Sequence, residues 1–417
     1  MDMIGWTARM TGVMRASLAL LAVALLAAAP AGQQPLRRAA PTAVGLAPDV
    51  LAEATALLEQ FVAEGRIAGG VAAIARRGQV GYLTAVGVQD LASKAPMTGR
   101  SLFRIYSMTK AVTAVAVMML HDEGRFRLDE PVSKYLPEFA EVRVVEGPGA
   151  APRAPARPVT NEDLLLHTAG LSHRTSDLYR ALGVRSRADT LPEFVRKITR
   201  APLMEDPHTR FRYSEATTVL GRLVEIWSGQ PFDRFLARRV FQPLGMNDTV
   251  FWVEGDRRGR LATVYGPAPG GGLTPVEIEP LPFTVRPALL EGAVGLISSV
   301  PDFLRFAQML LDKGTAGGTR LLKAETAARI TTNGLPPEVL TARGGRMGWG
   351  LANVNVLMDA GGTTASVGEY GWDGTAGTIF WNDPVKQTVV VLMTQSAPAN
   401  PDGLRQKFKA IADRAIR

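Results

Sequence analysis

The feature that most constrains the fold is a helix-length run that has no polar face. Residues 111–120 read AVTAVAVMML, which is apolar on nearly every side of a helix, and Gly124 follows as the expected C-terminal glycine. A helix that is apolar all round lies inside a protein. The run is also too short to cross a bilayer, which takes about 20 apolar residues. The sequence therefore predicts a buried central helix that the rest of the chain surrounds.

The segments on the two sides of this helix have different patterns. Before it, residues 49–64 have the apolar spacing of a helix that stops at Gly65. The runs 70–76 and 80–87 then read as a β-hairpin. After the central helix come Pro- and Gly-rich loops, at 146–158 and 266–273. The other elements expected in this part are helices at 161–167, with Thr160 and Asp163 as a capping box, and at 191–198, 216–227 and 232–240.

After about residue 345 the pattern returns to strands. They are expected at 348–356, 377–381 and 387–393, and a helix at 401–416 closes the chain. Strands at both ends therefore bracket a helical middle. The simplest arrangement pairs both ends in one antiparallel sheet with helices on its faces. We predict an α/β (α+β) fold of this kind, with an inserted all-α lobe at about 111–290 and a cleft where the two lobes meet.

The first residues are expected to be a targeting segment. Two arginines precede a small and apolar run over 16–29, and Ala29-Pro30-Ala31 has the small-residue pattern of a cleavage site. We therefore expect a signal peptide over 1–31, a flexible Pro- and Ala-rich lead-in over 32–46 and one two-lobed domain over 47–417. This organisation predicts a periplasmic or secreted protein with no stable membrane span after signal cleavage.

The composition excludes several classes of function. The net charge is +8, but the positive residues are scattered and form no basic tract interleaved with aromatics, so nucleic-acid binding is not expected. The chain has no cysteine, which removes disulfides, thiolate metal sites and cysteine nucleophiles. Its four histidines form no HExxH spacing, which argues against a zinc hydrolase. We expect no metal, no cofactor and a small molecule as the partner.

Ser107 and Lys110 stand three residues apart at the start of the central helix. Residues at i and i+3 share a helix face, so the lysine amine can lie beside the serine hydroxyl. The apolar helix behind the pair desolvates it, and a desolvated lysine can take the proton that makes a serine nucleophilic. The spacing alone also fits a helix-start serine beside an exposed lysine. The pair is thus a candidate nucleophile with its activating group.

The surroundings of the pair, SLFRIYSMTKAV at 101–112, resemble the serine hydrolases of the β-lactamase and penicillin-binding-protein superfamily. The likeness is greatest to class C β-lactamases and to the related family VIII carboxylesterases and D-aminopeptidases. LLLHTAGLSH at 164–173 is similar to a further family segment, FRYSEA at 211–216 to the second motif (Y-x-N) and GEYGWDGTAG at 368–377 to the third. The resemblance extends from about residue 45 to 415.

This resemblance implies a role for each matching residue. Ser107 is the nucleophile, Lys110 is part of the base, and Tyr213 shuttles a proton between Ser107 and the leaving group. The backbone N–H groups of Ser107 and Thr375 form the oxyanion hole. His167 matches a position whose role in the family is structural, so it is not expected to be catalytic. The turn at 292–296 is expected to serve packing.

The sequence departs from the family pattern at two motifs. Glu215 stands where β-lactamases have Asn, and Trp372-Asp373-Gly374 replaces the Lys-Thr-Gly that helps to hold a substrate carboxylate. These changes remove a cation and add acidic groups, unless Asp373 faces away from the cleft as strand alternation permits. The residues expected to contact substrate are Tyr106, Glu215, Trp372, Asp373 and Gly374.

The expected activity is hydrolysis of a carboxylic ester or small amide through an acyl-enzyme on Ser107, because the W-x-G motif is what the esterase branch tends to show. Three alternatives stay open. The chain could be a β-lactamase, a D-Ala-D-Ala carboxypeptidase or D-aminopeptidase, or a non-catalytic penicillin-binding-type sensor module. The intact set of Ser107, Lys110 and Tyr213 argues against the last of these.

Overall fold

The computed structural model describes residues 36–145, 147 and 149–417. The expected signal peptide at 1–31 and the start of the lead-in lie outside the described residues. The described part of the lead-in is not the flexible segment that was expected. It forms a 3-10 turn at Pro41–Val44, and the side chains of Val44 and Leu46 are buried over Gly81, where a β-carbon would lie 2.6 Å from Val44. The lead-in is thus part of the folded domain.

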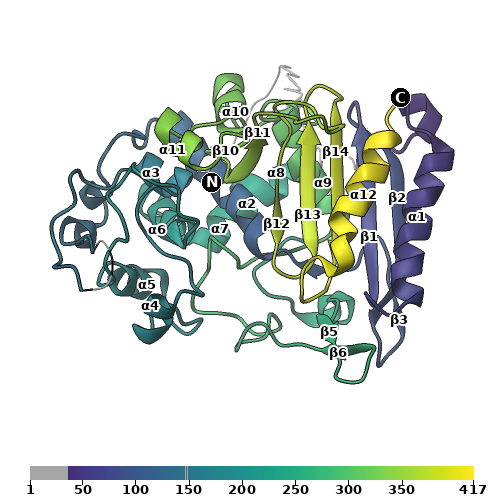
Figure 1. Cartoon of the computed structure of the whole chain (residues 1–417), viewed down its shortest axis with the longest axis horizontal. Coiled ribbons are helices and arrows are strands. Elements are labelled where there is room, and N and C mark those ends of the chain that lie inside the picture. Colours follow the sequence, from purple (N-terminus) through teal and green to yellow (C-terminus); the bar gives the residue numbers. More distant parts are fainter. Residues whose placement is uncertain (1–35, 146, 148) are drawn as a thin grey trace, which may run out of the picture. The chain divides into compact units, whose positions relative to one another are not determined.

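An antiparallel sheet of eight strands joins the two ends of the chain, as the sequence predicted (Figure 1). The strand that links them is β1, which pairs with β14 on one side and β2 on the other. In sheet order the strands are β10 (Met347–Gly350), β11 (Val354–Leu357), β12 (Tyr370–Gly374), β13 (Thr378–Asp383), β14 (Thr388–Thr394), β1 (Gly69–Arg76), β2 (Gln79–Asp90) and β3 (Ala95–Pro96).

Helices cover both faces of this sheet. Every residue of β1 and β14 is buried, because α1 (Pro48–Ala63) and α12 (Leu404–Arg414) pack on one face and α9 (Val300–Leu311) on the other. Figure 1 shows α1 and α12 side by side along the outer face. The expected closing helix begins later than predicted, since 401–403 is a 3-10 turn.

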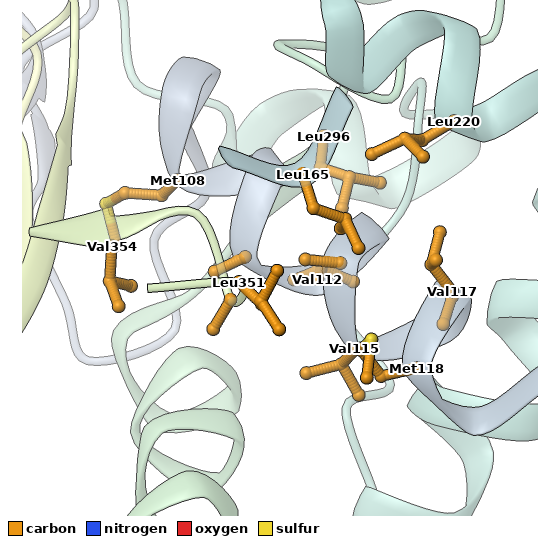
Figure 2. Packing of buried hydrophobic residues seen from close by; sticks show 14 of the residues in the cluster. Met108, Val112, Val115, Val117, Met118, Leu165, Leu220, Leu296, Leu351 and Val354 are labelled. Atoms are coloured by element: carbon orange, nitrogen blue, oxygen red, sulfur yellow. The ribbon is translucent and has the colours of Figure 1, made fainter. Parts of the chain in front are cut away.

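The apolar run at 111–120 is a central buried helix, as predicted. It lies within α2 (Thr109–Asp122), whose residues from Thr109 to Leu120 are all buried. Figure 2 shows Val112, Val115 and Met118 packed against side chains from other segments, among them Leu165 and Leu351. The other helices of this lobe are α3 (Asn161–Leu166), α4 (Asp177–Ala181), α5 (Leu191–Ile198), α6 (Ala216–Ser228), α7 (Phe232–Leu236) and α8 (Gln242–Leu244); α10 (Ala324–Ile330) and α11 (Pro337–Ala342) follow α9.

Several elements differ from the prediction. The strand expected at 348–356 is two strands, because Asn353 takes a left-handed conformation (φ 57°) between β10 and β11. The loop expected at 266–273 is the turn of a small hairpin, β5 (Tyr265–Pro267) and β6 (Leu273–Pro275), so the inserted lobe is not purely helical. The helix expected at 232–240 changes to π-helical hydrogen bonding at Ala237–Phe241. Two further short pairs are β4 (Phe103–Arg104) with β7 (Ile297–Ser298) and β8 (Thr315–Ala316) with β9 (Thr319–Arg320).

None of the helices in the described part of the chain combines the length and the apolar character that a membrane span requires.

Candidate active site

Ser107 lies in a short 3-10 turn, Tyr106–Met108, that leads directly into α2. Tyr106 has a positive φ of 41°, a conformation that bulky residues rarely adopt and that marks strain held by the surrounding fold. The turn is packed from the other side by β12, because Gly374 lets that strand approach; a β-carbon there would lie 2.4 Å from the carbonyl oxygen of Ile105. Ser107 keeps 8% of its surface exposed, so its hydroxyl lies at the edge of the interior.

Lys110 is fully buried one helical turn further on. Its amine donates a hydrogen bond of 3.1 Å to the carbonyl oxygen of Ala293 and lies 4.6 Å from the centre of the Tyr213 ring. Ala293 belongs to the turn at 292–296 that sequence reasoning assigned to packing alone, so this turn also fixes the lysine. No hydrogen bond joins the Ser107 hydroxyl to Lys110 or Tyr213 among the described residues. In unliganded enzymes catalytic hydrogen bonds are often long and tighten on substrate binding.

Tyr213 sits in an aromatic cage just before α6. Its ring lies 4.9 Å from His167, 5.6 Å from His173 and 5.2 Å from Trp372 between ring centres. The Trp372 indole N–H donates a hydrogen bond of 3.1 Å to the Tyr213 hydroxyl. The Tyr213 hydroxyl is thus held by a donor, and the Lys110 amine lies against the ring. The arrangement is therefore suited to proton transfer at Tyr213.

His167 ends α3 in a left-handed conformation and is fully buried. Its Nδ1 lies 3.0 Å from the Ser214 hydroxyl, and its ring packs edge-on against Trp349. Burial, together with the positive charge of Lys110, lowers the pKa of this imidazole well below its ordinary value, so the ring is neutral. Its contacts fix the segment that carries Tyr213.

The two N–H groups expected to form the oxyanion hole come from segments that pack together. The Ser107 N–H belongs to the turn before α2, and Thr375 follows directly on β12, which packs against that turn. Within the described part of the chain, the Thr375 N–H makes no hydrogen bond to another residue. An N–H beside Ser107 that donates to none of the described residues can bind an anionic oxygen.

Trp372 and Asp373 point to opposite faces of β12, as alternation along a strand requires. Trp372 faces Tyr213 and Trp349, whereas Asp373 forms an ion pair with Arg405 of α12 on the outer face. Arg405 also donates to the carbonyl oxygens of Gly374, at 2.8 Å, and Thr378, at 3.0 Å. The expectation that Asp373 contacts substrate is therefore corrected: it anchors the end of β12 from behind.

Glu215 and Tyr106 were also expected to contact substrate, and both are buried instead. Glu215 has no exposed surface and Tyr106 keeps 1%. The Tyr106 ring packs edge-on against Phe283 and beneath the guanidinium of Arg174, and burial raises the pKa of its phenol to about 12. Neither side chain therefore exposes a surface that a bound molecule could contact. Of the substrate-contact residues named from the sequence, Trp372 and the Gly374 backbone remain.

A buried network of charges beside the site escaped sequence reasoning. Arg185 pairs with Glu291 and, at 2.9 Å, with Glu279, which also lies 3.4 Å from Arg174. These residues come from loops whose contacts no local pattern encodes. Trp349 completes the aromatic cage around Tyr213. In the sequence it was recognised only as part of a predicted strand. No group of three or more ligating side chains able to hold a metal ion occurs in the described part of the chain.

Comparison with known proteins places this site in a family. The family model described as Beta-lactamase matches residues 54–413. Protein Rv1367c of Mycobacterium tuberculosis is 32% identical over 355 residues, covering 80% of this chain and 87% of the relative. Esterase EstB of Burkholderia gladioli is 32% identical over 384 residues, covering 86% and 93%. The solved structure of EstCE1, described as a hydrolase with promiscuous acyltransferase activity, superposes with a TM-score of 0.75 at 28% identity and covers 88% of this chain and 98% of its own. The chain belongs to the beta-lactamase family.

Proposed function

We propose that this protein is a serine hydrolase that cleaves carboxylic esters through an acyl-enzyme on Ser107. The observation that carries the proposal is the buried Lys110 amine, 4.6 Å from the centre of the Tyr213 ring, on the helix that Ser107 leads into. A cation held against a phenol in a dry site lowers the cost of the phenolate, which can then accept a proton. Family membership and the esterase and hydrolase among the relatives support the same chemistry.

The proposed reaction has two halves. The Ser107 oxygen attacks the ester carbonyl while its proton passes to the Tyr213 and Lys110 pair, and the carbonyl oxygen takes its charge against the N–H groups of Ser107 and Thr375. The pair then gives the proton to the departing alcohol. In the second half a water attacks the acyl carbon and passes a proton to the same pair. That proton returns to the Ser107 oxygen as the acid leaves.

The choice of an ester over a β-lactam rests on the third motif. The indole of Trp372 stands where a lysine would attract a carboxylate, and its one N–H is engaged by Tyr213. Asp373 adds no repulsion in the cleft, because it is paired with Arg405 on the other face of the strand. The site still has no cation at position 372. A neutral substrate with an apolar acyl group therefore fits the Trp372 side of the site better than an anion does. The experiment below therefore compares the cleavage of esters with that of a β-lactam.

The experiment is a panel of p-nitrophenyl acetate and butyrate, D-amino-acid amides and a chromogenic cephalosporin, with mass spectrometry of the protein during turnover. We expect ester turnover, an acyl adduct on Ser107 and a loss of about 10³-fold or more in Ser107→Ala. The variant should keep the wild-type circular dichroism spectrum. Retained ester turnover in Ser107→Ala would remove the nucleophile assignment, and a kcat/KM higher for the cephalosporin than for the esters would reverse the substrate class.

We also propose that the protein is exported, since the apolar run at 16–29 followed by Ala29-Pro30-Ala31 is typical of a secretory signal. N-terminal sequencing of the protein recovered from the cell exterior or periplasm is expected to begin near residue 32. Recovery of uncleaved chain in the cytoplasm alone would contradict export.

A further inference from the structure

Glu215 is a carboxylate held inside the protein with almost no hydrogen bonding. The residue has no exposed surface, and its Oε1 is buried without a partner. Its Oε2 accepts only a long hydrogen bond, 3.4 Å, from the hydroxyl of Thr218 in the first turn of α6. A buried carboxylate with so little direct compensation is costly unless charges around it replace the lost solvent. The question is which charges do so.

Titratable groups from four segments interact electrostatically with this carboxylate. They are Lys110 on α2, His173 and Arg174 after α3, Tyr179 on α4, and Arg185 before α5. Burial alone would raise the pKa of the Glu215 carboxyl, but the charges of Lys110, Arg174 and Arg185 outweigh burial and lower it. Glu215 is therefore an anion in the folded protein.

Two of these three cations are already engaged by other carboxylates. Arg185 forms ion pairs with Glu279 and Glu291, and Arg174 lies 3.4 Å from Glu279. Lys110 differs, because its amine donates to the carbonyl oxygen of Ala293 and makes no ion pair within the part of the chain described. Glu215 itself forms no direct ion pair among the described residues, and Lys110 is the one of these three cations that forms none there.

The sequence position of Glu215 strengthens the link between these two charges. It stands two residues after Tyr213, whose ring centre lies 4.6 Å from the Lys110 amine, and directly before α6, which packs along α2. Because Glu215 is fully buried, it does not touch a substrate in the cleft. Any effect on the reaction has to pass through Lys110 and Tyr213.

We propose that Glu215 is a positioning residue that supplies the counter-charge of the Lys110 amine, which lies against the Tyr213 ring. The inference rests on the proposed function, in which Lys110 and Tyr213 receive the proton of Ser107. A fixed negative charge favours the protonated form of every group near it, whether that group is the amine or the phenol. The pH at which the proton acceptor becomes active is therefore set partly by Glu215.

The test is the pH profile of kcat/KM for p-nitrophenyl acetate. Glu215→Gln removes the charge at constant size, so the midpoint of the acid limb should move to lower pH by about one unit. Glu215→Asp keeps the charge and should hold the limb near its wild-type position. Glu225→Gln is the matched control, because it makes the same change on the same helix, about 15 Å further along. We expect no movement of its limb.

A second measurement does not depend on turnover. Tyrosinate absorbance is titrated in the wild type and in Glu215→Gln, each against its own Tyr213→Phe counterpart, so that the difference reports Tyr213 alone. Its midpoint should be lower in Glu215→Gln. A purely structural role would change stability or kcat and leave both midpoints in place.

The outcomes separate the two proposals. Ester turnover on Ser107 with an unmoved acid limb in a folded Glu215→Gln overturns this inference and leaves the proposed function standing. If the wild type cleaves no ester, the proposed function fails and the tyrosinate titration decides the charge relationship by itself. If Glu215→Gln does not fold, Glu215→Asn is measured in its place with the same expected direction, and an unmoved limb in that variant also overturns the inference.

Discussion

The Trp372 indole donates a hydrogen bond of 3.1 Å to the Tyr213 hydroxyl, so the sheet and the helical lobe meet at the oxygen that is proposed to carry the proton. The donor comes from β12 and the acceptor from the segment before α6. Such a bond stabilises the phenolate more than the phenol, because the charged oxygen is the stronger acceptor. Trp372, which stands where related enzymes have a substrate-binding lysine, thus also contacts Tyr213, part of the proposed base.

Trp372→Phe tests this second role. The change keeps an aromatic wall but deletes the N–H, so the Tyr213 oxygen loses its hydrogen-bond donor. We expect kcat/KM to fall about tenfold at neutral pH, the value of roughly one hydrogen bond, and its acid limb to move to higher pH. Trp252→Phe is the control, since the Trp252 indole donates to Glu254, on a segment that contributes nothing to the site. If the acid limb of kcat/KM does not move in Trp372→Phe, the indole N–H has no part in the proton transfer.

Lys110→Met should lower turnover sharply and also cost stability, because it leaves Glu215 buried without its proposed counter-charge. Methionine fills the space of the lysine stem in an apolar helix and removes the cation that lies against Tyr213. We expect a fall in kcat of about 10²–10⁴-fold, the usual worth of a positioned acid–base group. Burst kinetics with p-nitrophenyl butyrate show whether acylation or deacylation is lost. Unchanged turnover in a folded variant would contradict any part for Lys110 in the base.

Arg405 and Asp373 should differ in effect although they form one ion pair. Arg405→Met removes the two hydrogen bonds to the carbonyl oxygens of Gly374 and Thr378, which fix the turn that carries the Thr375 N–H. We expect a lower Tm and a fall in kcat of about tenfold. Asp373→Asn leaves those bonds in place and changes a side chain that is 45% exposed, so its stability should stay within about 0.5 kcal/mol of wild type. If Arg405→Met and Asp373→Asn lost equal amounts of kcat, the hydrogen bonds from Arg405 to the two carbonyl oxygens would not be what fixes the turn.

The pattern of apolar residues was enough to predict the framework. The central helix was predicted from its unbroken apolar run, and β1, β2 and β14 from short apolar runs bounded by turn residues. The capping box of Thr160 and Asp163 is also present, with both of its hydrogen bonds. The break between β10 and β11 was missed, since Asn353 turns there to satisfy Thr217 and the carbonyl oxygen of Leu165, which are distant in sequence.

From the residues alone, without the family resemblance, the site was predictable only where its chemistry is local in sequence. Ser107 and Lys110 are three residues apart, so their placement on one helix could be expected. The orientation of Asp373 and the burial of Glu215 depend on which face α12 covers and on how α6 packs against α2. The partners of those side chains, Arg405 and the group around Arg185, come from distant segments and leave no signal near them.

Asp302 should make stability depend on pH. This carboxyl is buried at the start of α9, and burial raises its pKa to about 6, although the N–H of Asp248 and the hydroxyl of Thr249 donate to it. A carboxyl whose folded pKa exceeds its unfolded value near 4 binds more protons in the folded state, so the free energy of unfolding falls as pH rises from about 4 to 6. We expect about 2 kcal/mol more stability near pH 4.5 than near pH 7 from this group alone. Asp302→Asn should flatten the profile in that window, as urea unfolding at several pH values will show.

Trp372→Lys should move substrate preference towards anions, and the structure argues for making this change alone. The paired change Asp373→Thr would also break the contact with Arg405, which lies on the other face of β12 from Trp372. A lysine at 372 restores the cation that the third motif lacks, on the face of the strand that meets Tyr213. We expect the ratio of kcat/KM for a chromogenic cephalosporin to that for p-nitrophenyl butyrate to rise about tenfold, the effect of one partly solvated charge pair. Trp372→Met, which removes the indole without adding charge, separates the gain of the cation from the loss of the indole N–H. Equal ratios in Trp372→Lys and Trp372→Met would mean that charge at this position does not select the substrate.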